Sequence, residues 1–322
     1  MRVVAALGGN ALLERGEPPD SDIQQGHITS AVAALAPVAR DHDLIITHGN
    51  GPQVGLLAME SARDPALARP YPFDVLGAQT QGMIGYWLVQ ALQNALPGRL
   101  AGCLVCRTLV SADDPAFADP VKFVGPVYDE ARARKLAAGY GWKVRQDGTA
   151  WRRVVPSPEP IELLDLPLIS ELLAAGAIVV CAGGGGVPVT RDAAGTMRGV
   201  EAVVDKDLTA ALLARSVQAD ALLLLTDVES VQENFGTAQA RPIRLATPGD
   251  LRARPGVRPR QRSGLRHRVR VPVAGRDRAP LVRQLADELA AHARAATGHH
   301  REFALEGIHA LAPPAGRRRR RP

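Results

Sequence analysis

The chain has only four lysines in 322 residues, and one of them lies where a lysine could act on a phosphoryl group. Lys206 stands between Asp205 and Asp207 in the stretch VDKDL, immediately before a predicted helix. A positive side chain at the start of a helix opposes the helix dipole unless an anion binds there. Lys206 is therefore a candidate cation for phosphoryl transfer. The alternative is an ordinary surface ion pair, worth ~0–1 kcal/mol.

Three glycine clusters offer the backbone donors that such chemistry needs. Each follows an apolar run that reads as a buried strand, and bare N–H groups at a strand-to-helix turn can hold a phosphate. A single cluster could be only a tight turn. Three clusters at the carboxyl ends of parallel strands favour a ligand site. They consist of Gly8, Gly9 and Asn10; of Gly49, Asn50 and Gly51; and of Gly183, Gly184, Gly185 and Gly186.

Other common chemistries lack their motifs in this sequence. There is no G-x-x-x-x-G-K-[ST] loop, no dinucleotide fingerprint with its acidic ribose ligand, no zinc-type spacing and no G-x-S-x-G elbow. Phosphoryl transfer without a covalent intermediate remains, and it needs backbone donors, cations and a carboxylate. Asp227, which ends the run LLLLTD, is a further candidate for nucleotide or metal contact, or else the N-cap of the next turn.

The elements that must position these residues alternate between strand-like and helix-like segments. Helical stretches such as 30–42 and 205–218 separate short apolar runs bounded by Gly, Asp or His. This rhythm predicts an α/β fold: a three-layer αβα sandwich with an open, mainly parallel sheet. The predicted strands lie within 2–7, 43–48, 102–110, 176–183 and 219–227.

Residues 112–163 interrupt this rhythm. They are rich in proline, charge and aromatic side chains, and they contain Trp142 and Trp151. We expect a small protruding subdomain of short strands or hairpins that serves as a lid. A surface insertion without function is the alternative.

The charge of the chain is unevenly distributed. Residues 1–251 carry 21 basic and 28 acidic residues, whereas residues 252–322 carry 18 arginines, no lysine and 5 acidic residues. The predicted pI of about 9.6 therefore reflects the last part of the chain, and the body is mildly acidic.

Composition also limits the compartment. No uninterrupted apolar stretch reaches the ~18 residues of a membrane span, and the N-terminus lacks a signal-peptide cleavage site. Cys103, Cys106 and Cys181 are read as buried thiols in a reduced cytoplasm. We expect a cytoplasmic protein without a membrane partner.

Eight stretches, in order, resemble carbamate kinases of the amino acid kinase family. They are ALGGNALL, THGNGPQVGLL, QTQGMIGYWL, KFVGPVY, WRRVVPSPEP, GGGGVPV, VEAVVDKDL and LLLTDVESV. THGNGPQVG and RRVVPSP are the most specific, and the resemblance runs from residue 3 to about residue 250. Other amino acid kinases, for acetylglutamate or uridylate, are weaker alternatives because the stretch around Lys122 and WRRVVPSP argues against them.

The resemblance implies an amino acid kinase domain over residues 1–251, with an eight-stranded sheet, and a homodimer. It implies reversible phosphoryl transfer from ATP to carbamate, formed from ammonia and bicarbonate, giving ADP and carbamoyl phosphate with Mg²⁺. In the family the ATP-forming direction commonly ends arginine breakdown.

The resemblance also implies roles for particular residues. Lys206 would act on the transferring phosphoryl group, Asp207 would orient Lys206, and Lys122 on the lid would supply a second cation. Gly8, Gly9, Asn10, Gly49, Asn50 and Gly51 would hold carbamoyl phosphate, whereas Gly183 to Gly186, Thr226 and Asp227 would line the nucleotide side. No protein side chain is assigned to a metal.

The resemblance stops before residues 252–322. The family continues with a glycine-serine-methionine-glycine-proline-lysine segment whose lysine reaches the ATP phosphates, and no lysine follows Lys206 here. We hypothesise a frameshift near residues 252–257, which the underlying nucleotides would test. A catalytically impaired family member is one alternative. The other is nucleic-acid binding through the arginines, which is disfavoured because no aromatic residues lie among them for base stacking.

Overall fold

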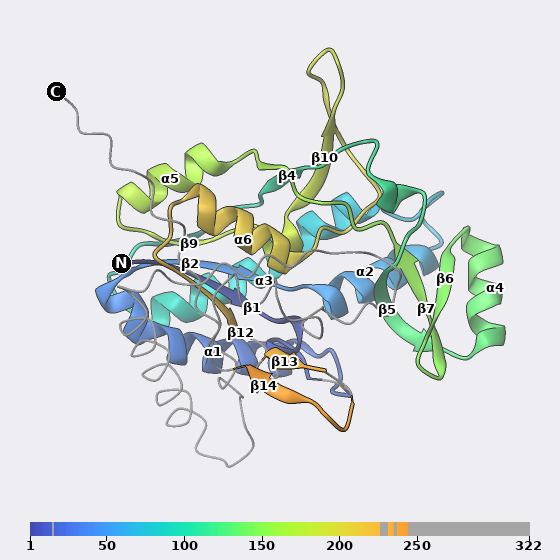
Figure 1. Cartoon of the computed structure of the whole chain (residues 1–322), viewed down its shortest axis with the longest axis horizontal. Helices are drawn as coiled ribbons and strands as arrows, with labels where there is room; N and C mark the ends of the chain where they lie inside the picture. Colours follow the sequence, from blue (N-terminus) through green and yellow to red (C-terminus); the bar gives the residue numbers. More distant parts are fainter. Residues whose placement is uncertain (15, 226–230, 235–236, 244–322) are drawn as a thin grey trace.

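The computed structural model describes residues 1–14, 16–225, 231–234 and 237–243, and structural statements below refer to these residues (Figure 1). The arginine-rich segment 252–322 and the predicted residues Thr226 and Asp227 lie outside them.

A five-stranded parallel sheet forms the centre of the molecule. Each strand is a short apolar run, as expected of strands covered on both faces. The predicted α/β class and mainly parallel sheet are confirmed. In spatial order the strands are β12 (Ala221–Leu225), β1 (Arg2–Leu7), β2 (Asp43–His48), β9 (Ile178–Val180) and β3 (Ala101–Cys103). The eight-stranded sheet that the resemblance implies stays a prediction, because residues 226–230 and 244–322 lie outside the described residues.

Helices cover both faces of this sheet, which gives three layers (Figure 1). Successive strand residues point to opposite faces, so Val3 and Ala5 pack in one core cluster while Val4 and Ala6 pack in the other. The first cluster contains α1 (Ser21–Asp41) and α3 (Phe73–Ala95). The second contains α5 (Leu166–Ala174) and α6 (Lys206–Ser216).

A second, mixed sheet continues from the edge of the first. Its order is β11 (Met197–Gly199), β10 (Val187–Arg191), β4 (Arg107–Leu109) and β8 (Glu162–Leu163), and only β4 and β10 run parallel. The prediction of one strand over 102–110 is wrong, because this run divides into β3 and β4. The side-chain amide of Gln81 bonds both backbone groups of Cys106 at the crossing.

Short elements connect these layers. α2 (Gly51–Arg63) follows β2 directly. Three single-turn 3-10 helices are η1 (Gly9–Ala11), η2 (Pro115–Phe117) and η3 (Gly183–Gly185). A hairpin of β13 (Val231–Glu233) and β14 (Arg241–Ile243) ends the described chain. Within this described part, no helix is both long and apolar enough to cross a membrane.

Residues 122–155 project from one end of the molecule, and we call them the protrusion (Figure 1). A three-stranded antiparallel sheet forms it, in the order β5 (Lys122–Tyr128), β7 (Ala150–Val155) and β6 (Lys143–Asp147). Short strands were expected here, but α4 (Glu130–Tyr140) was not. Asp129 caps α4 by accepting from the Arg132 N–H, and Gly141 ends it in the left-handed conformation.

The protrusion rests on α2 and α3 through a separate apolar cluster. Val124 and Val155 from the protrusion join Val54, Phe73 and other buried side chains of the two helices. The backbones also approach closely: a Cβ on Gly55 of α2 would lie 2.3 Å from the Cα of Gly125. Only glycine fits at this contact, since Gly125 also has a φ of +68°.

Candidate active site

The glycine clusters meet at the carboxyl ends of β1, β2 and β9. Gly8 donates its N–H to the carbonyl of Leu225 in β12, and Gly49 donates to the carbonyl of Leu7 in β1. A Cβ on Gly49 would lie 2.8 Å from the Gly9 nitrogen. The first two clusters therefore touch through bare backbone. Asn10 lies in η1, which begins at Gly9.

The third cluster, Gly183 to Gly186, contacts the second cluster. Gly184, Gly185 and Gly186 all have positive φ, which favours glycine. A Cβ on Gly184 would meet the Asn50 side chain at 2.3 Å, and one on Gly185 would meet the Val204 carbonyl at 2.6 Å. Glycine is thus needed in this cluster because a side chain would not fit, as well as for the backbone donors.

Two threonine hydroxyls hold this third cluster in place. Thr108 Oγ1 and Thr209 Oγ1 both donate to the Gly185 carbonyl, at 2.8 and 3.1 Å. Both threonines are fully buried. They join the second sheet and α6 to the loop, so the loop geometry is fixed from two sides.

The second cluster leads into the N-terminus of α2. The Asn50 amide is buried and donates to Thr80 Oγ1 at 2.8 Å, so it orders the loop from within. Gly51 begins α2, with Pro52 in its first turn. The first N–H groups of a helix lack partners inside the helix and carry partial positive charge. This end of α2 is suited to an anion.

His48, at the end of β2, lies between the second and third clusters. It is 1% exposed, and its imidazole occupies the space where a Cβ on Gly183 would stand. Nδ1 lies 3.0 Å from the Gly49 carbonyl oxygen, so Nδ1 carries the proton and Nε2 is an acceptor. Burial lowers the pKa of His48 to about 4; the hydrogen bond to Gly49 opposes this shift and Lys206 adds to it.

Two lysine–aspartate pairs stand at the N-terminus of α6. Lys122 Nζ, at the start of the protrusion, lies 2.7 Å from Asp205 Oδ2. Lys206 Nζ lies 2.9 Å from Asp207 Oδ1. The predicted cations are thus brought to one place, although they are far apart in the sequence.

Asp205 has a larger role than the sequence indicated. Its Oδ1 accepts from the N–H groups of Asp207 and Leu208, so it caps α6 while its other oxygen holds Lys122. Burial opposes its ionisation, but the charge of Lys122 and these hydrogen bonds outweigh burial and lower the pKa of Asp205 to about 2. The carboxylate stays charged at any physiological pH.

Sequence reasoning missed two residues of the site, Asp205 and His48. The signal for Asp205 was its place before a helix, where Asp is a common N-cap. The signal for His48 was a polar residue ending a buried strand. Thr226 and Asp227, the predicted nucleotide contacts, lie outside the described residues.

The carboxylates suit a cation that arrives with phosphates more than a resident metal. Across residues 1–225, leaving aside residue 15, and the β13–β14 hairpin, no group of three or more His, Cys, Asp or Glu is placed to hold a metal ion. Asp205 is occupied by Lys122 and two N–H groups, whereas the Asp207 side chain is 56% exposed. Mg²⁺ commonly binds substrate phosphates with one or two carboxylates and retains several waters. Asp207 fits that pattern.

Comparison with known proteins agrees with this geometry. The family model described as "Amino acid kinase family" matches residues 1–264. Carbamate kinase of Rhizobium meliloti (strain 1021) is 51% identical over 255 residues, covering 78% of this chain and 78% of the relative. Carbamate kinase of Escherichia coli (strain K12) is 52% identical over 249 residues, covering 77% and 82%.

Solved structures give the same result. Carbamate kinase from Giardia lamblia bound to citric acid superposes with a TM-score of 0.73 at 36% identity, covering 78% of this chain and 81% of that one. The same enzyme bound to AMP-PNP gives 0.70 at 36% identity, covering 78% and 82%. By sequence and by structure, this chain belongs to the amino acid kinase family.

Proposed function

We propose that this chain is a carbamate kinase, which transfers a phosphoryl group reversibly between ATP and carbamate. The observation that carries the proposal is the pair of lysines, Lys122 and Lys206, held by aspartates beside three glycine loops. The curated relatives at 51% and 52% identity are carbamate kinases, which supplies the acceptor.

The proposed mechanism is positioning and charge stabilisation, because a transferring phosphoryl group needs little covalent help. Backbone N–H groups of Gly8, Gly9, Gly49 and Gly51, with Asn10 and Asn50, would hold carbamoyl phosphate at the N-terminus of α2. Lys206 would lie on the transferring group, with Asp207 fixing its direction. Lys122 would neutralise charge from the opposite side.

The nucleotide would lie on the side of Gly183 to Gly186, with Thr226 and Asp227 as further contacts. The similarity to a carbamate kinase bound to AMP-PNP supports a nucleotide site in this fold. Mg²⁺ would be held by the phosphates and Asp207, and when bound it would neutralise charge on the phosphate oxygens.

The protrusion would act as a lid over this site. Lys122 is its first residue and contacts α6 directly, so movement of the protrusion changes the distance between this cation and the phosphates. The domain boundaries proposed from the sequence remain 1–251 for the kinase domain and 112–163 for the lid.

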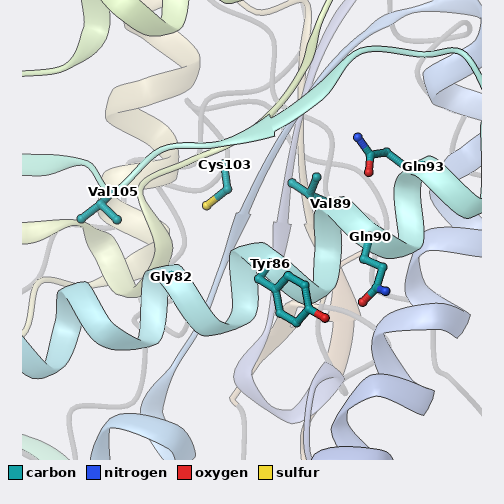
Figure 2. A pocket seen from close by; sticks show the side chains of 7 residues that line it. All are labelled: Gly82, Tyr86, Val89, Gln90, Gln93, Cys103 and Val105. Carbon is teal, nitrogen blue, oxygen red and sulfur yellow. The ribbon is translucent and has the colours of Figure 1, made fainter.

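We also propose a homodimer formed through α3 and the edge strand β3. This edge exposes Tyr86, Leu100 and Val105, and β3 pairs on one side only among the described strands, so its free side can pair with another chain. A hollow of about 470 Å³ lies there, and Figure 2 shows the side chains that line it. It is lined by Gly82, Tyr86, Val89, Gln90 and Gln93 of α3 and by Cys103 and Val105.

The cellular setting is proposed from the family and from the thiols. Cys103, Cys106 and Cys181 are all free, and burial raises the pKa of Cys103 to about 11. Thiols without disulfide bonds suit a reduced cytoplasm. A role in the last step of arginine breakdown follows from the family resemblance.

The first experiment measures ATP formation by the purified chain from carbamoyl phosphate and ADP with Mg²⁺. Lys206→Ala is expected to lower kcat by ~10²–10³-fold, because one cation on the transferring group is lost. Lys135→Ala is the matched control, since Lys135 is an exposed lysine of α4, and it should leave turnover unchanged.

Two other outcomes would contradict the proposal in different ways. A folded chain without turnover would identify a family member disabled by the sequence after residue 251, where the expected lysine is absent. Turnover that survives Lys206→Ala would mean that the transferring group lies elsewhere.

A further inference from the structure

Arg153 lies between two aromatic rings at the junction of the protrusion and the body. Its guanidinium carbon is 4.6 Å from the centre of the Phe73 ring and 4.5 Å from that of Trp142. The Arg153 side chain is 16% exposed, and burial lowers its pKa to about 10, although Glu201 opposes the shift. The group is therefore charged at neutral pH, and its two ring contacts limit the directions it can take.

Glu201 completes this arrangement from the body. One carboxylate oxygen lies 3.2 Å from Arg153 Nη2, and the other accepts the N–H of Phe73 at 2.8 Å. Phe73 is the first residue of α3, whose preceding residue Pro72 provides no side-chain cap. Glu201 thus caps α3 with a negative charge and fixes Arg153 at the same time. We call Arg153, Phe73, Trp142 and Glu201 the Arg153 clamp.

The clamp belongs to a row of three bonds that join β5, β7 and Pro156 to residues 201–205. Arg153 meets Glu201, the Val203 N–H donates to the Pro156 carbonyl at 3.0 Å, and Lys122 meets Asp205. In the small sheet, Lys122 pairs with Val155, beside the strand position of Arg153. On the other segment, Asp205 lies only four positions after Glu201. A shift at one end of the row must therefore move the other end.

We propose that Arg153 is a positioning residue for phosphoryl transfer, acting through Lys122. With Glu201 it sets how the protrusion docks on the segment before α6, and hence where the Lys122 ammonium stands relative to the phosphates. Its two ring contacts and its bond to Glu201 fix direction as well as distance, which a flexible lysine in its place would not do. The inference rests on the proposed phosphoryl transfer, in which Lys122 is a cation of the site.

The first test is a kinetic double-mutant cycle with Lys122. Arg153→Met keeps the apolar stem but removes the charge, and it should lower kcat by about 10²-fold, because a displacement of about 1 Å of a positioned group has that effect. KM for ADP should change little. In the Lys122→Ala background the same change should cost less than about threefold, since the cation it positions is already absent.

Neighbouring residues provide the controls. Arg152, which precedes Arg153 in β7, also contacts an aromatic ring and a carboxylate. Its partners Phe123 and Asp147, however, both belong to the protrusion. Arg152→Met should leave kcat within about twofold of the unsubstituted chain. Arg153→Lys should restore part of the loss. If Arg153→Met prevents folding, the same kinetic cycle with Lys122→Ala is measured with Arg153→Lys and Glu201→Gln instead.

A second readout does not depend on activity. Hydrogen exchange of the Val203 amide reports the bond to Pro156, and it should accelerate in Arg153→Met but not in Arg152→Met. The positioning role is overturned if Arg153→Met and Lys122→Ala act additively on kcat, or if exchange at Val203 is the same in both arginine variants. Absence of turnover in the unsubstituted chain would instead reject the proposed function, and exchange would still decide whether the clamp holds the protrusion.

Discussion

At the scale of single residues, the two aspartates on either side of Lys206 bind different lysines. From the sequence, VDKDL is one lysine between two carboxylates. In the structure Asp207 holds Lys206, and Asp205 holds Lys122, which is 83 residues away. The second pairing could not be predicted, because nothing local to either residue names its partner. The sequence shows that charges gather around Lys206, but only the fold shows which aspartate binds which lysine.

Asp205→Asn should therefore affect both activity and stability. It removes the charge that holds Lys122, so kcat should fall by about 10²-fold. The folded pKa of about 2 lies below the ordinary value of 3.8, so the charge stabilises the fold above about pH 4. This contribution, on the order of 1 kcal/mol after solvent screening, is lost as pH falls from 4 to 2.

Urea unfolding at pH 7 and near pH 2.5 measures that contribution. The unsubstituted chain should exceed Asp205→Asn in stability at pH 7 and approach it near pH 2.5. An equal difference at both pH values would mean that the carboxylate charge is not what Asp205 contributes.

His48 should make stability depend on pH in a different range. Its folded pKa of about 4 lies below the ordinary 6.5, so the folded state disfavours the protonated ring. Stability is then complete above pH 6.5, falls as pH drops from 6.5 to 4, and the total loss is about 3 kcal/mol. His48→Gln, unable to take up a proton, should abolish this slope in thermal or urea unfolding. A slope unchanged in His48→Gln would assign it to another group.

At the scale of elements, the sequence predicted most of the central sheet. β1 and β2 match the apolar runs 2–7 and 43–48, because a strand buried on both faces must be apolar throughout. The run 102–110 misled, since it is equally apolar but crosses from one sheet to another at Cys106. Burial alone does not tell a strand from a buried crossing. The hydrogen bonds between Gln81 and Cys106 at the crossing join residues 25 positions apart, so no local pattern announces them.

The contact between α2 and β5 depends on the absence of side chains. Gly55→Ala would place a Cβ 2.3 Å from the Gly125 Cα, and backbone on both sides cannot move far. We expect a loss of about 1–3 kcal/mol from overpacking, with lower kcat because the protrusion carries Lys122. Gly77→Ala on α3 is the control, since a Cβ there meets nothing within 4 Å. It should be neutral or stabilising by up to about 1 kcal/mol.

Thermal unfolding and kcat of the two variants separate these effects. A Gly55→Ala chain as stable and as active as the Gly77→Ala chain would mean that α2 and the protrusion do not pack as described.

At the scale of the whole molecule, the ordered motifs indicated the family, and the fold supports it through residue 225. The nucleotide side was only partly accessible to prediction, because Thr226 and Asp227 lie outside the described residues. The sequence does show one departure from the family pattern: the lysine expected to reach the ATP phosphates is absent, and no other lysine can replace it. No lysine follows Lys206, and an arginine would present a different geometry to a phosphate. The rate of the unsubstituted chain will therefore measure how much the two lysines at α6 can achieve alone.

The proposed homodimer covers an apolar sheet edge that has no partner strand among the described residues. β3 is the outer strand of the central sheet, and Tyr86 beside it on α3 is 59% exposed. A carboxylate buried without a partner at an interface costs several kcal/mol, so Tyr86→Glu should weaken self-association by at least about 10²-fold. Val127 is equally exposed, at 59%, but lies on the protrusion, so Val127→Glu should leave association unchanged. Sedimentation equilibrium decides between the surfaces: a dimer insensitive to Tyr86→Glu must form elsewhere, and a monomeric unsubstituted chain would reject the dimer.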